Sequence, residues 1–309
     1  MTAPSEACKP HDASAFPSPA ASPVADRPPR AAATLVVVRE AGEGGFEVLL
    51  SRRAERGDHN SGAWVFPGGI VEASDGGAHA ACDGLDDAAA SARLGLAAGG
   101  LDFFVAAVRE CFEESGLLFA RDASGQWVDL DAVDAGRLGP WRGTLHRGER
   151  DMAALCISEN IRLAMDRLVY FSHWLTPLGR PKRFDTRFFL AVLPPGQTAA
   201  HDGTELVEQQ WLRPADALAR SQQLKLLTPT LKTLQLLAGF ADMAGVMAWA
   251  LAPRSVALVM PRVAHGAAGF RPVLVHRSGR ENVGRPRAGQ ARGRRAGGAL
   301  RRRWRTGAR

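Results

Sequence analysis

Three glutamates lie close together in the segment R-E-C-F-E-E-S-G, residues 109–116. On a helix, residues three and four positions apart share one face, so Glu110, Glu113 and Glu114 would crowd together and repel one another. Two interpretations follow: a solvated acidic face, or a site that a bound cation completes. Carboxylate oxygens are hard ligands of the kind that Mg²⁺ and Mn²⁺ prefer. The three glutamates are therefore candidate metal ligands.

A helix must position these carboxylates, and residues 103–115 predict one. Their apolar side chains recur at helical spacing, the acids lie off that stripe, and Gly116 follows as a C-cap. A short helix is predicted near 86–98, and further helices within 127–170 and 215–250. The predicted strands are 32–40, 46–53, 63–66, 117–120, 183–194 and 203–214. This order predicts a mixed sheet between helices, an α/β/α sandwich in one domain from about residue 32 to 260.

The charge of the chain is unevenly distributed. Its 309 residues carry a formal net charge of +7. Residues 271–309 contain 13 Arg and one acidic residue, which gives +12, so the other residues carry 7 − 12 = −5. The basic character belongs to the tail, and a nucleic-acid partner is expected only through that tail. The four cysteines are scattered without a C-x-x-C pair, which favours a reduced, cytoplasmic protein without structural zinc or disulfides.

The two ends of the chain differ in composition from the middle. Residues 1–31 are rich in Pro, Ala and Ser, lack an apolar signal-peptide core, and are predicted to be disordered. Residues 261–309 are expected to form an Arg/Gly-rich tail without a core of its own. Two interpretations of the tail stay open: a native basic arm, or a frameshifted C-terminus after about residue 275. The most apolar stretch, 234–260, is interrupted by charge and proline, so no membrane span is predicted.

Two separated stretches together resemble the Nudix box, G-x5-E-x7-R-E-U-x-E-E-x-G-U, in which U is an apolar residue. Gly69 fits the first glycine, Asp75 stands where the family has Glu, and residues 109–117 fit the second half. The 33 residues 76–108 replace the usual seven. Closure entropy grows slowly with loop length, so the box is interpreted as split by a helical insertion, residues 76–102. The resemblance implies a Nudix-type α/β/α fold and hydrolysis of a diphosphate linked to another moiety.

The split box is similar to one branch of that family, the coenzyme A diphosphatases with interrupted Nudix boxes. Residues 49–69, LLSRRAERGDHNSGAWVFPGG, are similar to the coenzyme A signature L-L-T-x-R-[SA]-x3-R-x3-G-x3-F-P-G-G. Ser51 replaces its Thr, and Asp58 stands where it has Arg. Residues 173–191, from HWLTP to RFDTRFFLA, also resemble this branch. The positions that match the signature are Leu49, Leu50, Arg53, Ala54, Gly62 and Phe66.

The resemblance implies a role for each residue of the box. Glu110, Glu113, Glu114 and the backbone carbonyl of Gly68 would bind Mg²⁺ or Mn²⁺. Glu113 would be catalytic and Arg109 would orient it, since a spacing of four allows the contact. Asp75 would tie the loop to the helix. A further acid joins from a late strand, where the candidates are Glu205 and Glu208. These two face opposite sides of a strand, and Glu208 is preferred.

Basic residues are the candidates for binding a polyanionic substrate. Arg52 and Arg53 alternate on a strand, so one of them faces inward, and Arg53 matches the signature. Arg183 and Arg187 share a strand face and could hold phosphates, or could lie in solvent. Gly69 is expected to lie against the substrate.

Three hypotheses for function remain. The favoured one is metal-dependent hydrolysis of coenzyme A or acyl-coenzyme A to 3′,5′-ADP and (acyl-)4′-phosphopantetheine. The second is the same chemistry on ADP-ribose, NADH or a capped RNA end. The third is a nucleotide-sensing or RNA-binding protein on a Nudix scaffold, a class that usually loses the metal carboxylates that are present here. The partner is a small nucleotide in the first hypothesis, and the oligomeric state is left open.

Overall fold

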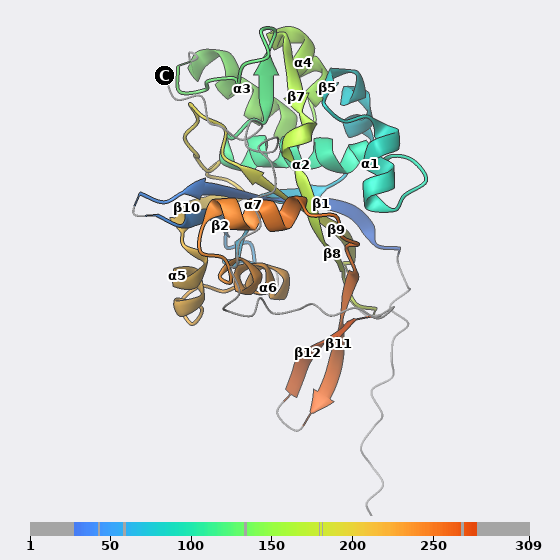
Figure 1. Cartoon of the computed structure of the whole chain (residues 1–309), viewed down its shortest axis with the longest axis vertical. Helices are drawn as coiled ribbons and strands as arrows, with labels where there is room; N and C mark the ends of the chain where they lie inside the picture. The colour runs from blue at the N-terminus through green and yellow to red at the C-terminus, as the bar shows by residue number, and fades with distance from the viewer. Residues whose placement is uncertain are drawn as a thin grey trace, which may run out of the picture.

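The computed structural model describes residues 28–276, except 43, 58–59, 133–134, 179, 181 and 267–268. Helices cover both faces of a central mixed sheet (Figure 1), which confirms the predicted α/β/α sandwich. The sheet contains, in spatial order, β10 (Leu206–Leu212), β2 (Phe46–Arg53), β1 (Arg30–Glu40), β9 (Phe184–Val192), β8 (Val169–Leu175), β11 (Leu258–Gly266) and β12 (Gly269–His276).

The middle strand of the sheet, β1, is apolar on both sides because each side meets a separate core. Leu35 and Val37 point to one cluster, and Val36 and Val38 point to the other. β1 runs parallel to β9 and antiparallel to β2. Continuous apolar runs are typical of strands covered on both faces. Towards its start β1 leaves β2 and pairs instead with β4 (Gly68–Ile70), while β3 (Trp64–Val65) pairs with β2.

The helix that carries the glutamates, α2 (Gly100–Ser115), lies across one face of the sheet (Figure 1). Its apolar stripe is buried against β1 and β9, and Phe104 packs against Phe189 with ring centroids 4.5 Å apart and the ring planes tilted by 52°. The helix ends at Gly116, whose φ of 71° is the left-handed conformation that glycine adopts without steric cost. The predicted helix and its C-cap are therefore confirmed.

The segment that interrupts the box is folded and supports α2. It contains the 3₁₀ helix η1 (Ala73–Ala81), β5 (Cys82–Asp83) and α1 (Asp87–Leu94). The first backbone amides of α2 have no cap from Gly99, but α1 supplies acceptors: Asp87 accepts bonds from Gly99 N and Leu101 N, and Ser91 Oγ from Gly100 N. Side-chain oxygens at a helix N-terminus satisfy amides that otherwise lack partners. The insertion thus anchors the start of the helix.

A second, smaller layer lies above α2 (Figure 1). It contains α3 (Ala135–His146), α4 (Met152–Glu159), η2 (Met165–Arg167) and a small sheet of β5, β7 (Ile161–Ala164) and β6 (Ala120–Asp122). β5 pairs in parallel with β7, so the insertion forms part of this layer. The strand predicted at 117–120 is wrong for its first three residues, because β6 begins only at Ala120. Residues 117–119 are fully buried, which explains why the apolar run resembled a strand.

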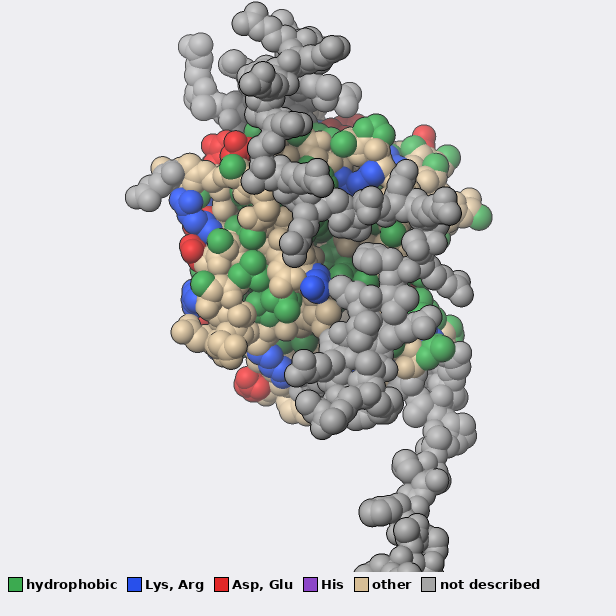
Figure 2. All heavy atoms as spheres, turned by 60° about the horizontal axis from the view of Figure 1, so that its bottom comes forward, with side chains coloured by type: hydrophobic (Ala, Val, Ile, Leu, Met, Phe, Trp, Pro, Cys, Tyr) green, Lys and Arg blue, Asp and Glu red, His purple; other side chains and the backbone are tan. Residues whose placement is uncertain are grey.

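The opposite face of the sheet is covered by α5 (Pro214–Ala219), α6 (Thr228–Leu237) and α7 (Met243–Leu251). On the side shown in Figure 2, hydrophobic side chains gather in patches, with Lys and Arg side chains both among them and toward the edge. β11 and β12 form a hairpin that extends away from the body (Figure 1). This hairpin crosses residue 261, where the tail was expected to begin, and continues to His276. The rest of the predicted tail and residues 1–27 lie outside the described residues.

Within the described ranges, no helix is long and apolar enough to span a membrane.

Candidate active site

The two halves of the interrupted box meet at Arg109. Its guanidinium donates to both carboxylate oxygens of Asp75, from Nε at 2.8 Å and from Nη2 at 3.2 Å. Nη2 also donates to the carbonyl of Ile70 at 2.8 Å. Nη1 reaches Glu110 Oε1 at 3.0 Å and Glu113 Oε1 at 3.2 Å. The bidentate bond fits the planar fork of an arginine. The buried guanidinium of Arg109 thus joins the Asp75 segment, β4 and α2.

The two glycines before the insertion allow β4 to approach α2 closely. A Cβ on Gly69 would lie 2.3 Å from Glu110 Oε1, and one on Gly68 would lie 2.4 Å from the carbonyl of Ala33. Gly68 N donates to Glu114 Oε2 at 2.8 Å. A side chain at Gly68 would clash with the backbone of β1, and one at Gly69 would displace the carboxylate of Glu110. Gly68 and Gly69 are therefore required by packing beside the glutamates, and their roles toward metal and substrate stay predictions.

Glu205, and not the preferred Glu208, lies beside the carboxylates of α2. Glu205 pairs with Arg53 at 3.3 Å, and its charge raises the pKa values of Glu110 and Glu114. Glu208 pairs with Arg52 at 2.8 Å and also accepts a bond from Gln210. The preference for Glu208 is corrected for a physical reason. β10 pairs with β2, and Arg52 and Arg53 point to opposite faces of β2.

We expect Glu205→Gln to weaken Mn²⁺ binding and turnover by about 10-fold or more, the scale of a lost contact at a metal site. Glu208→Gln is the matched control, since it removes the same charge three residues along the chain and on the other side of the sheet. It should change both quantities by less than about twofold. Mn²⁺ titration followed by electron paramagnetic resonance measures the first quantity directly. Equal effects of the two variants would contradict this placement.

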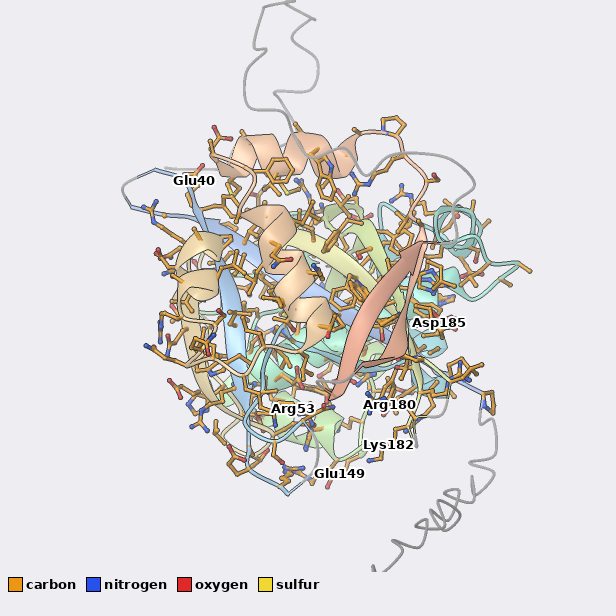
Figure 3. The ribbon with its side chains drawn as sticks, turned by 90° about the horizontal axis from the view of Figure 1, so that it is seen from below. Glu40, Arg53, Glu149, Arg180, Lys182 and Asp185 are labelled. Atoms are coloured by element: carbon orange, nitrogen blue, oxygen red, sulfur yellow. The ribbon has the colours of Figure 1, made fainter. Side chains whose placement is uncertain are left out.

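Arg183 and Arg187 do not gather with Arg53. Arg187 is 4% exposed, bonds to His173 and Asp185, and lies 5.4 Å from the ring centre of Phe103 at the start of α2. Figure 3 shows Asp185 well to one side of Arg53. Arg183 Nε donates to the carbonyl of Thr176 at 3.2 Å. Arg53 is thus the basic residue of this set that the structure brings to the glutamates, while the phosphate-binding role of Arg187 loses its geometric support.

Burial makes the glutamates of α2 hard to ionise in the absence of a bound cation. Burial raises the pKa of Glu113 to about 7, although the charge of Arg109 opposes the rise. It also raises the pKa of Glu110 to about 7, with repulsion from Glu113 and Glu205 added. The pKa of Glu114 lies well above its usual range, through burial first and the charge of Glu110 second. A nearby divalent cation would favour the charged forms of all three groups.

The types of donor atom in the site suit a hard divalent cation, but the side chains are not arranged around a common point as metal ligands would be. Three glutamates, Glu205 and the carbonyl of Gly68 are oxygen donors of the type that Mg²⁺ and Mn²⁺ take. As the described side chains stand, no three carboxylate, imidazole or thiol groups converge in a way that could hold a metal ion. The hydrogen bonds to Arg109 and Gly68 N account for this, because they draw the glutamates toward protein donors. Binding a cation requires these side chains to rotate.

Two further residues near Glu113 have no motif in the sequence that would reveal them. His146, the last residue of α3, has Nδ1 3.8 Å from Glu113 Oε2 and is partly exposed. Arg142, one turn earlier, donates to the carbonyl oxygens of Glu113 and Ala200 at 3.1 and 2.8 Å. α3 comes from a segment predicted only as generally helical. Their position depends on how α3 packs on α2, which spacing along the chain does not encode.

Comparisons with known proteins agree with this geometry. The family model described as the NUDT19 Nudix domain matches residues 86–235. The acyl-coenzyme A diphosphatase NUDT19 of Gallus gallus is 30% identical over 242 residues, 64% of this chain and 62% of that protein. The human protein of the same name is 28% identical over 235 residues, with the same coverage. A crystal structure of a NUDIX hydrolase from Alicyclobacillus acidocaldarius superimposes with a TM-score of 0.60 at 28% identity, covering 72% of this chain and 96% of that one.

The fold, the reunited box and these similarities support a Nudix hydrolase, a class that generally uses divalent metal ions. Within that class it resembles the coenzyme A diphosphatase branch. The family match begins at residue 86, after Pro67–Asp75. The pairing of Arg109 with Asp75 and the fit of Gly69 against Glu110 are the structural reasons for joining that first half to the second. The chain spans about three fifths of the length of the curated relatives it matches.

Proposed function

We propose that this protein hydrolyses the diphosphate of coenzyme A or acyl-coenzyme A, giving 3′,5′-ADP and (acyl-)4′-phosphopantetheine. The observation that carries the proposal is the network around Arg109, which joins Asp75 to the glutamates of α2 across a 33-residue interruption. The similarity to proteins named acyl-coenzyme A diphosphatases supports this substrate over other nucleotides. The cytoplasm is our expected location for the protein.

In the reaction, water adds to one phosphorus of the diphosphate and the bridging P–O bond breaks. Mg²⁺ or Mn²⁺, held by Glu110, Glu114, Glu205 and the carbonyl of Gly68, would neutralise the diphosphate and acidify water. Glu113 accepts the proton of the attacking water, a role for which a nearby cation would keep its carboxylate charged. Arg109 holds Glu113 in place through Nη1. Arg53, at the end of β2, is placed to contact a phosphate oxygen.

The test is an assay of the full-length protein with coenzyme A, acetyl-coenzyme A, ADP-ribose, NADH and a capped RNA, each with Mg²⁺ or Mn²⁺. Products are separated by chromatography. We expect 3′,5′-ADP from the two coenzyme A substrates, and no product when a chelator is present. Cleavage of ADP-ribose, NADH or capped RNA alone would retain the chemistry and overturn the substrate.

The sensor hypothesis makes a different prediction in the same assay. A nucleotide-binding protein without activity would cleave none of the five substrates, yet would retain one of them in equilibrium dialysis. The metal carboxylates present in α2 favour the enzyme over this alternative. The preference between Mg²⁺ and Mn²⁺ follows from comparing initial rates at matched saturation with each ion.

A further inference from the structure

Two polar side chains on neighbouring strands of the central sheet are buried, and within the described part of the chain they have no hydrogen-bond partners. Ser51, on β2, is 0% exposed, and its Oγ bonds to nothing in the described part of the chain. Gln209, its cross-strand partner on β10, has a buried amide whose Nε2 and Oε1 both lack partners there. An unsatisfied buried polar group costs about 1–3 kcal/mol. Two such residues directly opposite each other in one sheet need a physical explanation.

Both residues lie on the face of the sheet that α2 covers. Leu49, two residues before Ser51, belongs to the core cluster that includes α2, and Trp211, two residues after Gln209, packs against that same cluster. Side chains two residues apart on a strand share a face. Arg53, two residues after Ser51, is on this face too, and it pairs with Glu205.

The pair is next to Glu114. The charge of Arg53 acts on Glu114 and lowers its pKa against the larger effect of burial. On the other side, Val65 pairs with Ser51, and three residues later Gly68 donates to Glu114. Two groups that act on the Glu114 carboxylate are therefore close to Ser51 in the chain or the sheet. Arg53 is two residues further along β2, and Gly68 N is three residues after Val65, the cross-strand neighbour of Ser51. The orphaned hydroxyl and amide therefore lie inside the protein, on the sheet face that α2 covers and two residues from the arginine that acts on Glu114.

We propose that Ser51 and Gln209 are outer partners of the metal site, and that they bind water molecules which a divalent cation retains there. The inference rests on the proposed metal-dependent function. Mg²⁺ gives up its waters reluctantly and usually keeps several when bound to protein. Such waters donate hydrogen bonds, which Ser51 Oγ and Gln209 Oε1 accept. Gln209 Nε2 then donates to an oxygen of the site, so all three orphaned atoms gain partners.

The arrangement explains why the two polar residues occupy positions where apolar ones would be more stable. In the metal-free protein the orphaned atoms oppose folding, and in the metal-loaded protein they strengthen cation binding. Groups that orient ligands from outside the coordination sphere typically contribute 10–100-fold in metal affinity. Ser51 and Gln209 are therefore positioning residues. They act on the cation through water and touch neither phosphorus nor attacking oxygen.

The experiment compares Ser51→Ala, Gln209→Met and the double variant with the unmodified protein, using Mn²⁺ as the probe. Mn²⁺ affinity is measured by electron paramagnetic resonance without substrate, and thermal unfolding is followed in chelator. We expect each single variant to bind Mn²⁺ about 10-fold more weakly and the double variant up to about 100-fold more weakly. Melting temperature in chelator should stay the same or rise, because an unsatisfied polar group has been removed.

Gln210→Met is the matched control, since Gln210 bonds to Glu208 and Arg220 on the other face of β10. It should leave Mn²⁺ affinity unchanged. Variants at Ser51 and Gln209 that fold and bind Mn²⁺ as tightly as the unmodified protein would overturn the inference while leaving the proposed function standing. Absence of Mn²⁺ binding by the unmodified protein would overturn both.

Discussion

Replacing Glu113 by Gln is expected to lower kcat by at least about 100-fold while leaving the fold intact, the scale of a lost acid–base contact. Glu113 Oε1 accepts a bond from Arg109, and Oε2 lies 3.8 Å from His146 Nδ1. Gln keeps the shape and one acceptor oxygen but cannot take a proton from water. The measurement is steady-state hydrolysis of coenzyme A at saturating metal, with kcat and KM determined separately.

A measurement of thermal stability shows whether Glu113→Gln loses activity because the catalytic group is gone or because the protein unfolds. Burial raises the pKa of Glu113 to about 7, above its usual range. The folded state therefore disfavours the charged form, and this destabilisation grows as pH rises from the unfolded pKa toward 7. A neutral Gln avoids it, so Glu113→Gln in chelator at pH 8 should melt no lower than the unmodified protein. Near-normal turnover by a folded variant would show that α2 is not the catalytic helix.

Replacing Arg109 by Met is expected to destabilise the metal-free protein by about 3–5 kcal/mol at pH 8, the usual effect of removing one partner from a buried ion pair. The side chain of Arg109 is 6% exposed and that of Asp75 is 0% exposed, so solvent cannot replace the lost bonds. Met preserves the length and apolar character of the stem. Denaturant unfolding in chelator, at matched pH, measures the change.

The pH dependence and a surface control make this prediction specific. At pH 5 the buried carboxyl groups can take up protons, and a neutral carboxyl group does not need the positive charge of Arg109. The destabilisation should therefore be smaller at pH 5 than at pH 8. Arg52→Met removes an arginine whose ion pair with Glu208 is 33% and 40% exposed, and exposed pairs contribute about 0–1 kcal/mol. An Arg109 variant no less stable than the Arg52 variant would contradict the buried network.

Much of the fold could be predicted because local patterns determine it. The apolar run within 46–53 indicates a strand, the stripe of 103–115 records which side of the helix is buried, and both elements are found close to their predicted bounds. The strand predicted at 117–120 was mostly wrong, since an apolar run buried on all sides carries no period. The hairpin that continues to His276 was missed because proline and glycine residues interrupt its apolar run, although its composition differs clearly from that of the Arg-rich residues after it.

The partners of the site residues could be predicted only in part. Arg53 was correctly chosen over Arg52 as the residue that faces the glutamates. Glu208 was preferred over Glu205, although strand geometry correctly placed them on opposite faces. Strand alternation predicts that Glu205 and Glu208 point to opposite faces. Which of them meets α2 depends on the register of β10 against β2, and a bulge between Leu206 and Glu208 shifts that register.

The sequence by itself determined the donor types, their helical spacing and the identity of the family motif, because these are written in neighbouring residues. Only the tertiary structure decided that Asp75 meets Arg109 across the insertion, that Glu205 joins the glutamates, and that Ser51 and Gln209 face each other across two strands with buried, unpartnered polar atoms. The physical reason is distance along the chain. Contacts between residues 34 to 158 positions apart arise when separate elements pack against one sheet, and no local period encodes that packing.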